Sequence, residues 1–355
     1  MHGLEAVEFR RLNKVGSNSR PNAFPLLLGR TTEAIVKKVM NVPTIEPDLS
    51  YNDYCNRYLD DIPYIPLEYK KAGYQMFGAE DYTASILNYP NCKGTKERQF
   101  EHSYRPLHSR LRDDKELKNI HLSGACRLLH SIMLDYLSKF VKSNKGWPKF
   151  ALTWLVDIAH DNTKHLYRGD YELYSFFLNN RHDNQPDSKF NDTTFKRSES
   201  NPRGSSLLRK FELGIRRTCK TLPIPFQYCT CQYKKENVSD IELLSELGKF
   251  AVQKLAGILR ENNVESKCAK IEIGNEVAAE KYVVPNAKHR LLYNLFDVTF
   301  TVAEPALGKF RIPVRMKKGK FELAGDQFDR LDKYGKNGDC MKQDILRPIC
   351  TCNRG

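Results

Sequence analysis

The chain lacks any long apolar segment. Its longest apolar runs, around residues 24–28 and 150–156, are far shorter than the roughly 18–20 residues with which a helix spans a bilayer. Residues 1–5 also lack the basic and apolar regions of a signal peptide. The sequence therefore predicts no transmembrane segment in this chain, and either a cytosolic protein or a chain that begins downstream of its true start.

The chain also has no block of five like charges. Lys and Arg outnumber Asp and Glu by 57 to 43, which gives a net charge of +14 over 355 residues. Such an excess can indicate a nucleic acid or an anionic surface as a partner. The basic residues are scattered, however, in pairs such as Arg10-Arg11 and Lys234-Lys235. We therefore interpret the charge as a solvated surface and expect no nucleic acid partner.

Histidine is scarce where cysteine is abundant. Seven of the ten cysteines follow residue 210, whereas His289 is the only histidine after residue 182. Two Cys-Thr-Cys tripeptides, at 229–231 and 350–352, have one intervening residue where a zinc site usually needs two or more. Disulfides formed in an oxidising compartment are therefore the favoured interpretation. Because seven is odd, one late cysteine must pair with an earlier one, pair between chains, or stay free.

Residues 1–180 alternate strand-like and helix-like segments, as in an α/β layer fold. We predict a short buried strand that ends at Glu80-Asp81, a helix with one buried face and a central apolar strand, at residues 73–79, 124–141 and 148–156. The last strand leads into Asp157, His160 and Asp161, and ligands in open α/β sheets gather at such an edge. Asp170 is expected to cap a helix that runs to about residue 178.

Residues 181–206 are polar and lack periodicity, which predicts a linker or an exposed loop. The remainder, 207–355, reads as a smaller, cysteine-rich α+β module. Within it, Ser239 and Glu242 fit a capping box before a helix with one apolar face. Alternating apolar residues predict two half-buried antiparallel strands, at residues 296–302 and 310–316. Pro313 places the second of these strands at the edge of its sheet.

The segment at residues 13–29 has the features of an anion-binding turn. Ser19 precedes Pro21-Asn22 and a predicted short helix, where backbone N–H groups can hold an anion. The alternative is that Ser19 only caps that helix. The segment resembles the nucleophile turn of the alkaline-phosphatase and sulfatase superfamily, and specifically of an uncharacterised metazoan domain-of-unknown-function family within it, number two hundred twenty-nine.

The resemblance extends along most of the chain. Blocks similar to those of the family lie at residues 62–65, 71–74, 79–81, 103–106 with Cys126, 155–161, 204–208, 217–219, 228–231, 334–335 with Cys340, and 346–352. The resemblance implies an incomplete alkaline-phosphatase-like α/β/α sandwich over residues 1–180. It also implies one site, in which Ser19 is the nucleophile, Asn22 contacts the anion, and Asp157 and His160 bind a divalent metal, zinc or calcium.

Two parts of the family pattern are missing. The first is a strand that normally carries a metal-binding aspartate and would precede the start of this chain. The second is an Asp-His-Gly block, which is absent between residues 178 and 204. His182-Asp183 in that region has the aspartate and the histidine in the opposite order and no following glycine. A catalytic zinc needs about three protein ligands, and this superfamily normally holds two cations. Asp157 and His160, with Asp161 and Ser19 as weaker candidates, do not supply two such sets. The alternative role for Asp157 and His160 is ordinary loop hydrogen bonding.

We therefore expect a secreted or lumenal sulfatase-like and phosphatase-like protein without full catalytic competence in this chain. A membrane anchor upstream of Met1 is compatible with this expectation. Acceptor patterns for N-glycosylation at Asn191 and Asn237 agree with a secretory route. The alternative function is a noncatalytic extracellular module that binds acidic glycans or phosphorylated ligands. In both cases the expected partner is an anionic small molecule or a glycan.

Overall fold

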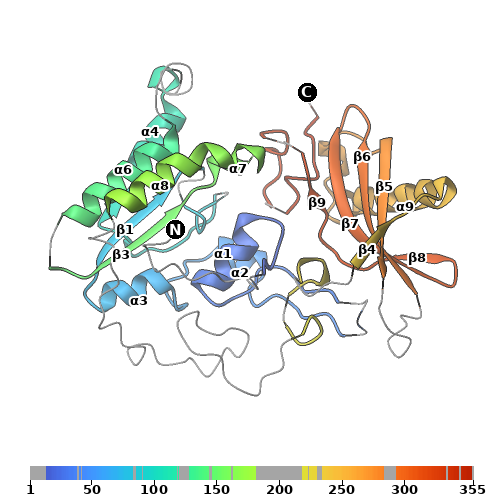
Figure 1. Ribbon diagram of the computed structural model, residues 1–355, viewed down its shortest axis with the longest axis horizontal. Helices are drawn as coiled ribbons and strands as arrows, with labels where there is room; N and C mark the ends of the chain where they lie inside the picture. Colours follow the sequence, from blue (N-terminus) through green and yellow to red (C-terminus); the bar gives the residue numbers. More distant parts are fainter. Residues whose placement is uncertain are drawn as a thin grey trace. The chain divides into compact units, whose positions relative to one another are not determined.

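The computed structural model describes the chain apart from residues 1–12, 38–39, 41, 83–84, 90, 118, 120–127, 144–145, 161–162, 181–217, 223, 230–233, 284–292, 333–334, 344 and 354–355. The chain divides into two compact units (Figure 1). The first unit comprises Met1–Arg10, Ala23–Arg30 and Leu49–Glu212, and the second comprises Arg11–Asn22, Thr31–Asp48 and Leu213–Gly355. The expected linker at residues 181–206 lies outside the described residues.

The first unit contains a parallel sheet whose described strands have the order β2-β1-β3. These strands are β1 (Gln75–Glu80), β2 (His102–Ser103) and β3 (Lys149–Trp154). Both predicted strands are confirmed, but the central position was assigned wrongly. Among the described strands β1 is central and buried, whereas β3 is mostly half-buried. An apolar run fits either position, because periodicity does not show which neighbour covers each face.

Helices lie on both faces of this parallel sheet (Figure 1). On one face, Tyr69 places its ring 4.4 Å from that of Phe150. On the other face, Phe140 lies 5.2 Å from Phe77. The helices of this unit are α2 (Tyr51–Cys55), α3 (Ile65–Lys71), α4 (Arg105–Asp113), α6 (Leu129–Lys142), α7 (Asp157–His160), η2 (Thr163–Gly169) and α8 (Asp170–Asn179). Helix α1 (Ser19–Leu27) has its first residues in the second unit and its last residues in the first.

Two predicted helices of the first unit are present with different starts. Helix α6 begins at Leu129 and buries Met133, Leu137 and Phe140 as its periodicity predicts, while most of the residues predicted before it lie outside the described residues. Helix α8 is capped by Gly169, so Asp170 is its first helical residue and not its cap. An aspartate in the first turn still interacts favourably with the helix dipole.

The second unit contains a six-stranded sheet with the order β4-β5-β6-β7-β8, in which β9 also pairs with β7. Its pairings are antiparallel, and its elements are η4 (Phe226–Tyr228), β4 (Lys234–Asn237), α9 (Ile241–Glu261), η5 (Glu265–Lys267), β5 (Ile273–Val283), β6 (Asn294–Val302), β7 (Gly308–Lys317), β8 (Lys320–Leu323) and β9 (Asp329–Arg330). Helix α9 packs on one face of this sheet (Figure 1). The fold is therefore mixed α/β, with one parallel and one antiparallel sheet.

The predicted helix and strands of the second unit are confirmed, but the predicted helix cap and the predicted edge strand are wrong. Helix α9 is capped by Asp240, whose carboxylate accepts the Leu243 N–H at 3.1 Å, so the cap is one residue later than predicted. Strand β7 is not at the edge, because it pairs with β6 and also with β8 and β9. Pro313 lies between the parts of β7 that pair with β9 and with β8. Its carbonyl accepts the Ala324 N–H at 2.9 Å, but proline has no N–H with which to return a bond to that neighbour.

The described cysteines form four disulfides. They join Cys55 to Cys92, Cys219 to Cys229, Cys268 to Cys350 and Cys340 to Cys352. The expectation of disulfides among the late cysteines is confirmed for the three bridges after residue 210. Cys126 and Cys231 lie outside the described residues. None of the described helices combines the length and the apolar character needed to cross a bilayer.

Candidate functional site

Strands β1 and β3 end side by side. They run parallel, with Glu80 in register with Trp154, so the residues that follow each strand emerge at the same edge of the sheet. Asp81 and Tyr82 follow β1, and Asp157 begins α7 shortly after β3. Tyr104 follows β2 at the same end of the sheet. We call Asp81, Tyr82, Tyr104, Asp157 and His160 the carboxyl-edge cluster.

The Asp81 carboxylate holds the turn between β3 and α7. Its Oδ1 accepts the backbone N–H of Val156 at 2.7 Å and that of Asp157 at 3.1 Å. Charge-assisted bonds of this kind are stronger than neutral ones. Asp81 therefore determines where the turn places the first residue of α7, which is the predicted metal ligand Asp157.

The next residue, Tyr82, holds the second predicted ligand. The Tyr82 ring stacks on the His160 imidazole, with ring centroids 3.8 Å apart and an interplanar angle of 22°. Consecutive residues at the end of β1 thus contact both predicted ligands, one through its carboxylate and one through its ring. The structure therefore brings Asp157 and His160 together on one short helix, with their supports supplied by β1.

Two polar atoms of the carboxyl-edge cluster are buried without a hydrogen-bond partner. They are Oδ2 of Asp81 and the hydroxyl of Tyr104, on residues that are 3% and 2% exposed. Burial raises the pKa of Asp81, and the charge of Asp157 raises it further, although the two backbone hydrogen bonds lower it. Burial, with the charges of Asp81 and Asp157, raises the pKa of Tyr104 to about 12. The buried groups of Asp81 and Tyr104 therefore lie within electrostatic reach of the exposed Asp157 carboxylate.

Glu80 is a third carboxyl group next to this region. Burial raises its pKa to about 7, and the nearby charge of Asp81 adds to the rise, whereas the Ile86 N–H and Arg105 lower it. A carboxyl group with such a pKa exists in both protonation states near neutral pH. The end of β1 therefore concentrates acidic groups that have little access to water.

The Ser19 turn belongs to the second unit, whereas Asp157 and His160 belong to the first. Ser19 is the first residue of α1 and is half-buried. The expectation that these residues form one site stays a prediction. Within the turn, a Cβ on Gly16 would meet the Pro21 ring at 2.4 Å. A larger residue at position 16 would therefore clash with Pro21, which explains the glycine.

Asn22, the predicted anion contact, is engaged in building the Ser19 turn. Its Oδ1 accepts the N–H of Val15 at 2.8 Å and of Gly16 at 3.3 Å. Its Nδ2 donates to the carbonyls of Gly16 at 2.9 Å and Asn18 at 2.6 Å. Both amide protons are used in this way. An anion would have to displace one of these bonds, so the predicted contact remains without structural support.

The described residues do not fit a catalytic zinc centre. Among them, no three carboxylate or imidazole groups bring their ligand atoms within 4.8 Å of one another, and such a centre needs about three protein ligands. Asp161, the weaker candidate, lies outside the described residues. The sulfur atoms of Cys340, Cys350 and Cys352 do lie within 4.8 Å of one another. Each is already bonded in a disulfide, which leaves no thiolate for a metal.

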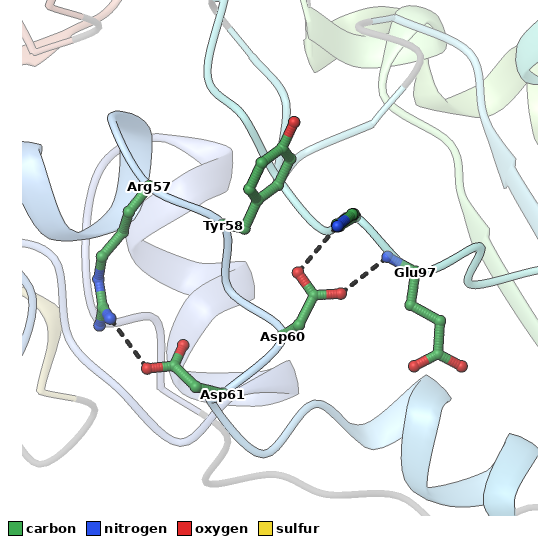
Figure 2. Close-up of a pocket in the computed structure, with 6 residues that line it drawn as sticks. Arg57, Tyr58, Asp60, Asp61 and Glu97 are labelled. Carbon is green, nitrogen blue, oxygen red and sulfur yellow. Dashed lines mark hydrogen bonds and ion pairs between the residues drawn. The ribbon is translucent and has the colours of Figure 1, made fainter.

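A surface hollow in the first unit lies around Asp60 (Figure 2). Its carboxylate accepts the backbone N–H of Lys96 and of Glu97, each at 2.8 Å. Partial burial raises the pKa of Asp60, but these two bonds, a bond from its own backbone N–H and the charge of Lys96 together lower the pKa overall. Asp61 pairs with Arg57 at 2.9 Å, and Figure 2 shows the Tyr58 ring pointing away from both carboxylates. The carboxylates of Asp60 and Asp61 are thus engaged in local structural contacts.

Sequence reasoning missed Tyr82 and Tyr104 as members of the cluster, and it gave Asp81 no role beyond ending a strand. The acidic pair after a buried strand was the available signal for Asp81. Tyr104 lies in the block at residues 103–106 that resembles the family, but no local period indicated its place, because β2 has only two residues. Parallel pairing of β1 with β3 brings Asp81 next to a segment 75 residues away.

Comparison with known proteins identifies the family. A family model described as "Protein of unknown function (DUF229)" matches residues 1–190 and 182–276. These ranges cover more than half of the chain, and the chain belongs to this family. No curated protein and no solved structure matches the chain.

Proposed function

We propose that the chain is a sulfatase-like and phosphatase-like protein of the alkaline-phosphatase superfamily, from a metazoan family, that resides outside the cell or in the secretory lumen. We further propose that this chain does not hydrolyse sulfate or phosphate esters. The superfamily assignment is supported by the resemblance of the blocks around Ser19 and Asp157. It is also supported by the place of Asp157 and His160 at the carboxyl edge of a parallel sheet, where ligands of such sheets bind.

The proposal that this chain does not hydrolyse esters rests on the side chains that could bind a metal at the carboxyl edge of the sheet. The described residues bring no three carboxylate or imidazole groups together. A serine hydroxyl is a poor nucleophile near neutral pH unless a metal or a positioned base takes its proton. Without a metal held in place, Ser19 stays protonated, and the charge that builds up on the ester oxygens has no fixed counter-charge.

The proposed location is supported by the disulfides. The described part of the chain contains four of them, and such bonds persist mainly in oxidising compartments. Asn237, at the end of β4, is exposed and begins an acceptor pattern for N-glycosylation. A glycan at Asn237 would therefore meet no steric obstacle from burial of that residue.

Ester hydrolysis tests the proposal. We expect the disulfide-intact chain to release nitrophenol from nitrophenyl sulfate and nitrophenyl phosphate no faster than a Ser19→Ala variant, with zinc or with calcium added. The physical reason is that an unmetallated serine alcohol stays protonated. The measurement is the absorbance of released nitrophenolate over time.

The contradicting outcome of the hydrolysis assay is specific. The proposal is contradicted if the chain reacts at least about tenfold faster than the Ser19→Ala control and a chelator abolishes this rate. A tenfold difference corresponds to about 1.4 kcal/mol of barrier. Such a result would mean that the chain is a metal-dependent hydrolase. An Asp61→Asn variant serves as a second control, because Asp61 forms only a surface ion pair with Arg57. Its rate is expected to equal that of the unmodified chain.

An exposed tyrosine face on α8 supports the second candidate, a noncatalytic module for acidic glycans. Tyr171 and Tyr174 are 75% and 62% exposed, and Tyr167 just before them is 71% exposed. Residues three and four apart share one helix face. Tyrosine rings combine an apolar face with a polar tip, which suits sugar rings, and Arg168 lies against the Tyr167 ring. Weaker retention of a Tyr171→Ala/Tyr174→Ala variant on immobilised heparin, with Tyr58→Ala as control, would support this candidate.

A further inference from the structure

Two disulfides of the second unit lie side by side near the end of the chain. They are Cys268–Cys350 and Cys340–Cys352. The Sγ atoms of Cys340 and Cys350, which belong to different bridges, are 3.8 Å apart, and the Sγ atom of Cys352 lies within 4.8 Å of both. Cys350 and Cys352 are two residues apart, and side chains at that spacing in extended backbone point to the same side. The two bridges therefore meet in one group of sulfur atoms.

The two bridges differ in their access to solvent. Cys340 is exposed and Cys352 is half-buried, whereas Cys268 and Cys350 are 5% and 0% exposed. The cysteines of the other described bridges are buried as well. The rate of thiol–disulfide exchange depends on access to the sulfur that is attacked. Among the described bridges, Cys340–Cys352 is therefore the one that a thiol in solution reaches most easily.

Backbone hydrogen bonds hold this group of sulfur atoms in place. The Ala269 N–H donates to the Thr351 carbonyl at 2.7 Å, next to the Cys268–Cys350 bridge. The Cys352 N–H donates to the Asn337 carbonyl at 2.8 Å, in the loop that leads to Cys340. Neither bond involves a sulfur atom. We therefore expect the sulfur atoms to remain neighbours after one of the bridges has opened.

We propose that the Cys340–Cys352 bridge is a thiol-exchange site for dithiols, and that its opening is passed on to the buried Cys268–Cys350 bridge. The product pairs Cys340 with Cys350 and leaves Cys268 and Cys352 as free thiols. This inference goes beyond the proposed function, because it involves neither an ester nor Ser19.

The first step reduces the exposed bridge. A thiolate of the dithiol attacks Sγ of Cys340, the bond to Cys352 breaks, and Cys352 leaves as a thiolate. The backbone N–H of Cys340 lies 3.1 Å from Sγ of Cys352 and stabilises that charge. The second thiol of the reductant then attacks the sulfur that its partner thiol has placed on Cys340, which closes the oxidised dithiol and releases Cys340 as a thiolate. The dithiol loses the electron pair that the opened bridge gains.

The second step needs no further reductant. The Cys340 thiolate attacks Sγ of Cys350, with which it is in contact, and the bond from Cys350 to Cys268 breaks. Cys268 keeps the electron pair of that bond and takes up a proton. The new bridge spans a sequence separation of 10 residues in place of 82. Because Cys268 belongs to the α9 core, the end of the chain is then no longer covalently tied to that core.

Limited reduction of the full, disulfide-intact chain tests the exchange. The chain is treated with dithiothreitol, samples are quenched over time with N-ethylmaleimide in denaturant, and the bridges are mapped by mass spectrometry of peptides without further reduction. The Cys340–Cys352 bridge is expected to disappear first, followed by the appearance of a Cys340–Cys350 bridge together with modified Cys268. The Cys219–Cys229 bridge, whose cysteines are 6% and 2% exposed, is the internal control and is expected to persist.

A double variant measures how far opening of the buried bridge depends on the exposed one. Cys340→Ser/Cys352→Ser removes the exposed bridge and keeps the buried one. Dithiothreitol is expected to open Cys268–Cys350 at least about tenfold more slowly in this variant than in the unmodified chain, because an external thiol has little access to a buried sulfur.

Two single variants identify the attacking cysteine without any reductant. Cys352→Ser leaves Cys340 as a free thiol, and part of the molecules are expected to contain the Cys340–Cys350 bridge. Cys340→Ser is the matched control, because it leaves Cys352 free instead. Residues two apart in extended backbone are separated by about 6.6 Å, near the upper limit for a disulfide. This control is therefore expected to retain Cys268–Cys350.

Several outcomes would overturn the exchange site. Loss of Cys340–Cys352 without a Cys340–Cys350 bridge would show that the two sulfur atoms do not exchange, and this result requires only the unmodified chain. Equal rates of opening of Cys268–Cys350 in the unmodified chain and in the double variant would exclude Cys340 as the attacking group. A bridge from Cys350 to any other cysteine would contradict the proposed product. The hydrolysis assay with Ser19→Ala uses no reductant, so the two proposals can fail separately.

Discussion

Lys37 shows how one buried charge can organise a loop. The residue is 1% exposed, and its ammonium donates to the carbonyls of Cys219, Lys220 and Leu222. Burial lowers the pKa of Lys37. The three carbonyls belong to the segment closed by the Cys219–Cys229 disulfide. One side chain therefore donates to three carbonyls of the loop, of which the Leu222 carbonyl also accepts the Ile224 N–H at 2.9 Å.

We expect Lys37→Met to destabilise the chain by about 2–3 kcal/mol, because methionine fills the space but removes the donor that the buried Lys37 gives to the carbonyls of Cys219 and Lys220. Urea denaturation measures the change in the free energy of unfolding. Lys309→Met is the control, since Lys309 makes an exposed ion pair with Glu276, and such pairs contribute about 0–1 kcal/mol. A Lys37→Met variant as stable as this control would contradict the role assigned to Lys37.

Glu80 predicts a pH dependence of stability. Its pKa is 4.5 in the absence of the fold and about 7 in the folded chain, chiefly because of burial. The folded state therefore binds the proton more tightly, and the free energy of unfolding falls as the pH rises from about 4.5 to about 7. Glu80→Gln does not titrate and is expected to remove this fall, which is on the order of 3 kcal/mol.

Urea denaturation at pH 5 and pH 7.5, with a chelator present, measures the effect of Glu80. The unmodified chain is expected to lose stability between these two pH values, relative to Glu80→Gln. Parallel stability in the two proteins across this range would show that the Glu80 carboxyl is not destabilised by burial.

At the scale of elements, helix α9 and the sheet beneath it form the most continuous core of the second unit. Leu247, Ala251 and Leu255 are buried against Phe296, Val298 and Phe300 of β6, with further residues of β7. Cys268 and Cys350 belong to the same core, and their disulfide closes a sequence separation of 82 residues. This bridge therefore ties the end of the chain to the α9 core.

We expect loss of the Cys268–Cys350 bridge to cost more than loss of the Cys340–Cys352 bridge. Separations of 82 and 12 residues correspond to about 4.5 and 3 kcal/mol in the loop-entropy model. The measurement is urea denaturation of the two Cys→Ser double variants. The reverse order of stability would mean that packing of the sulfur atoms, and not loop closure, controls the effect.

At the scale of the whole molecule, the disulfides link the chain to its compartment. Peptide mapping of the native protein without reductant is expected to yield the pairs Cys55–Cys92, Cys219–Cys229, Cys268–Cys350 and Cys340–Cys352. The reason is that secreted chains form such bridges during folding. Recovery of these cysteines as free, alkylatable thiols would contradict both the pairing and the proposed location.

The sequence by itself determined the elements in which the local pattern of apolar residues indicates the buried face. The apolar face of α9, the alternation in β6 and β7, the buried strand β1 and the oxidised state of the late cysteines were all predictable. Each follows from a local period or from composition, because a segment that buries one face must repeat apolar residues at the spacing of its own geometry.

Only the tertiary structure decided which segments meet. It placed β1 and not β3 at the centre of the described parallel strands, gave β7 neighbours on both sides of Pro313, and joined Asp81 to the turn before Asp157. It also determined which cysteines pair. These are choices among alternatives with similar local patterns, and they depend on the sum of many contacts between segments far apart in the chain, which no single segment records.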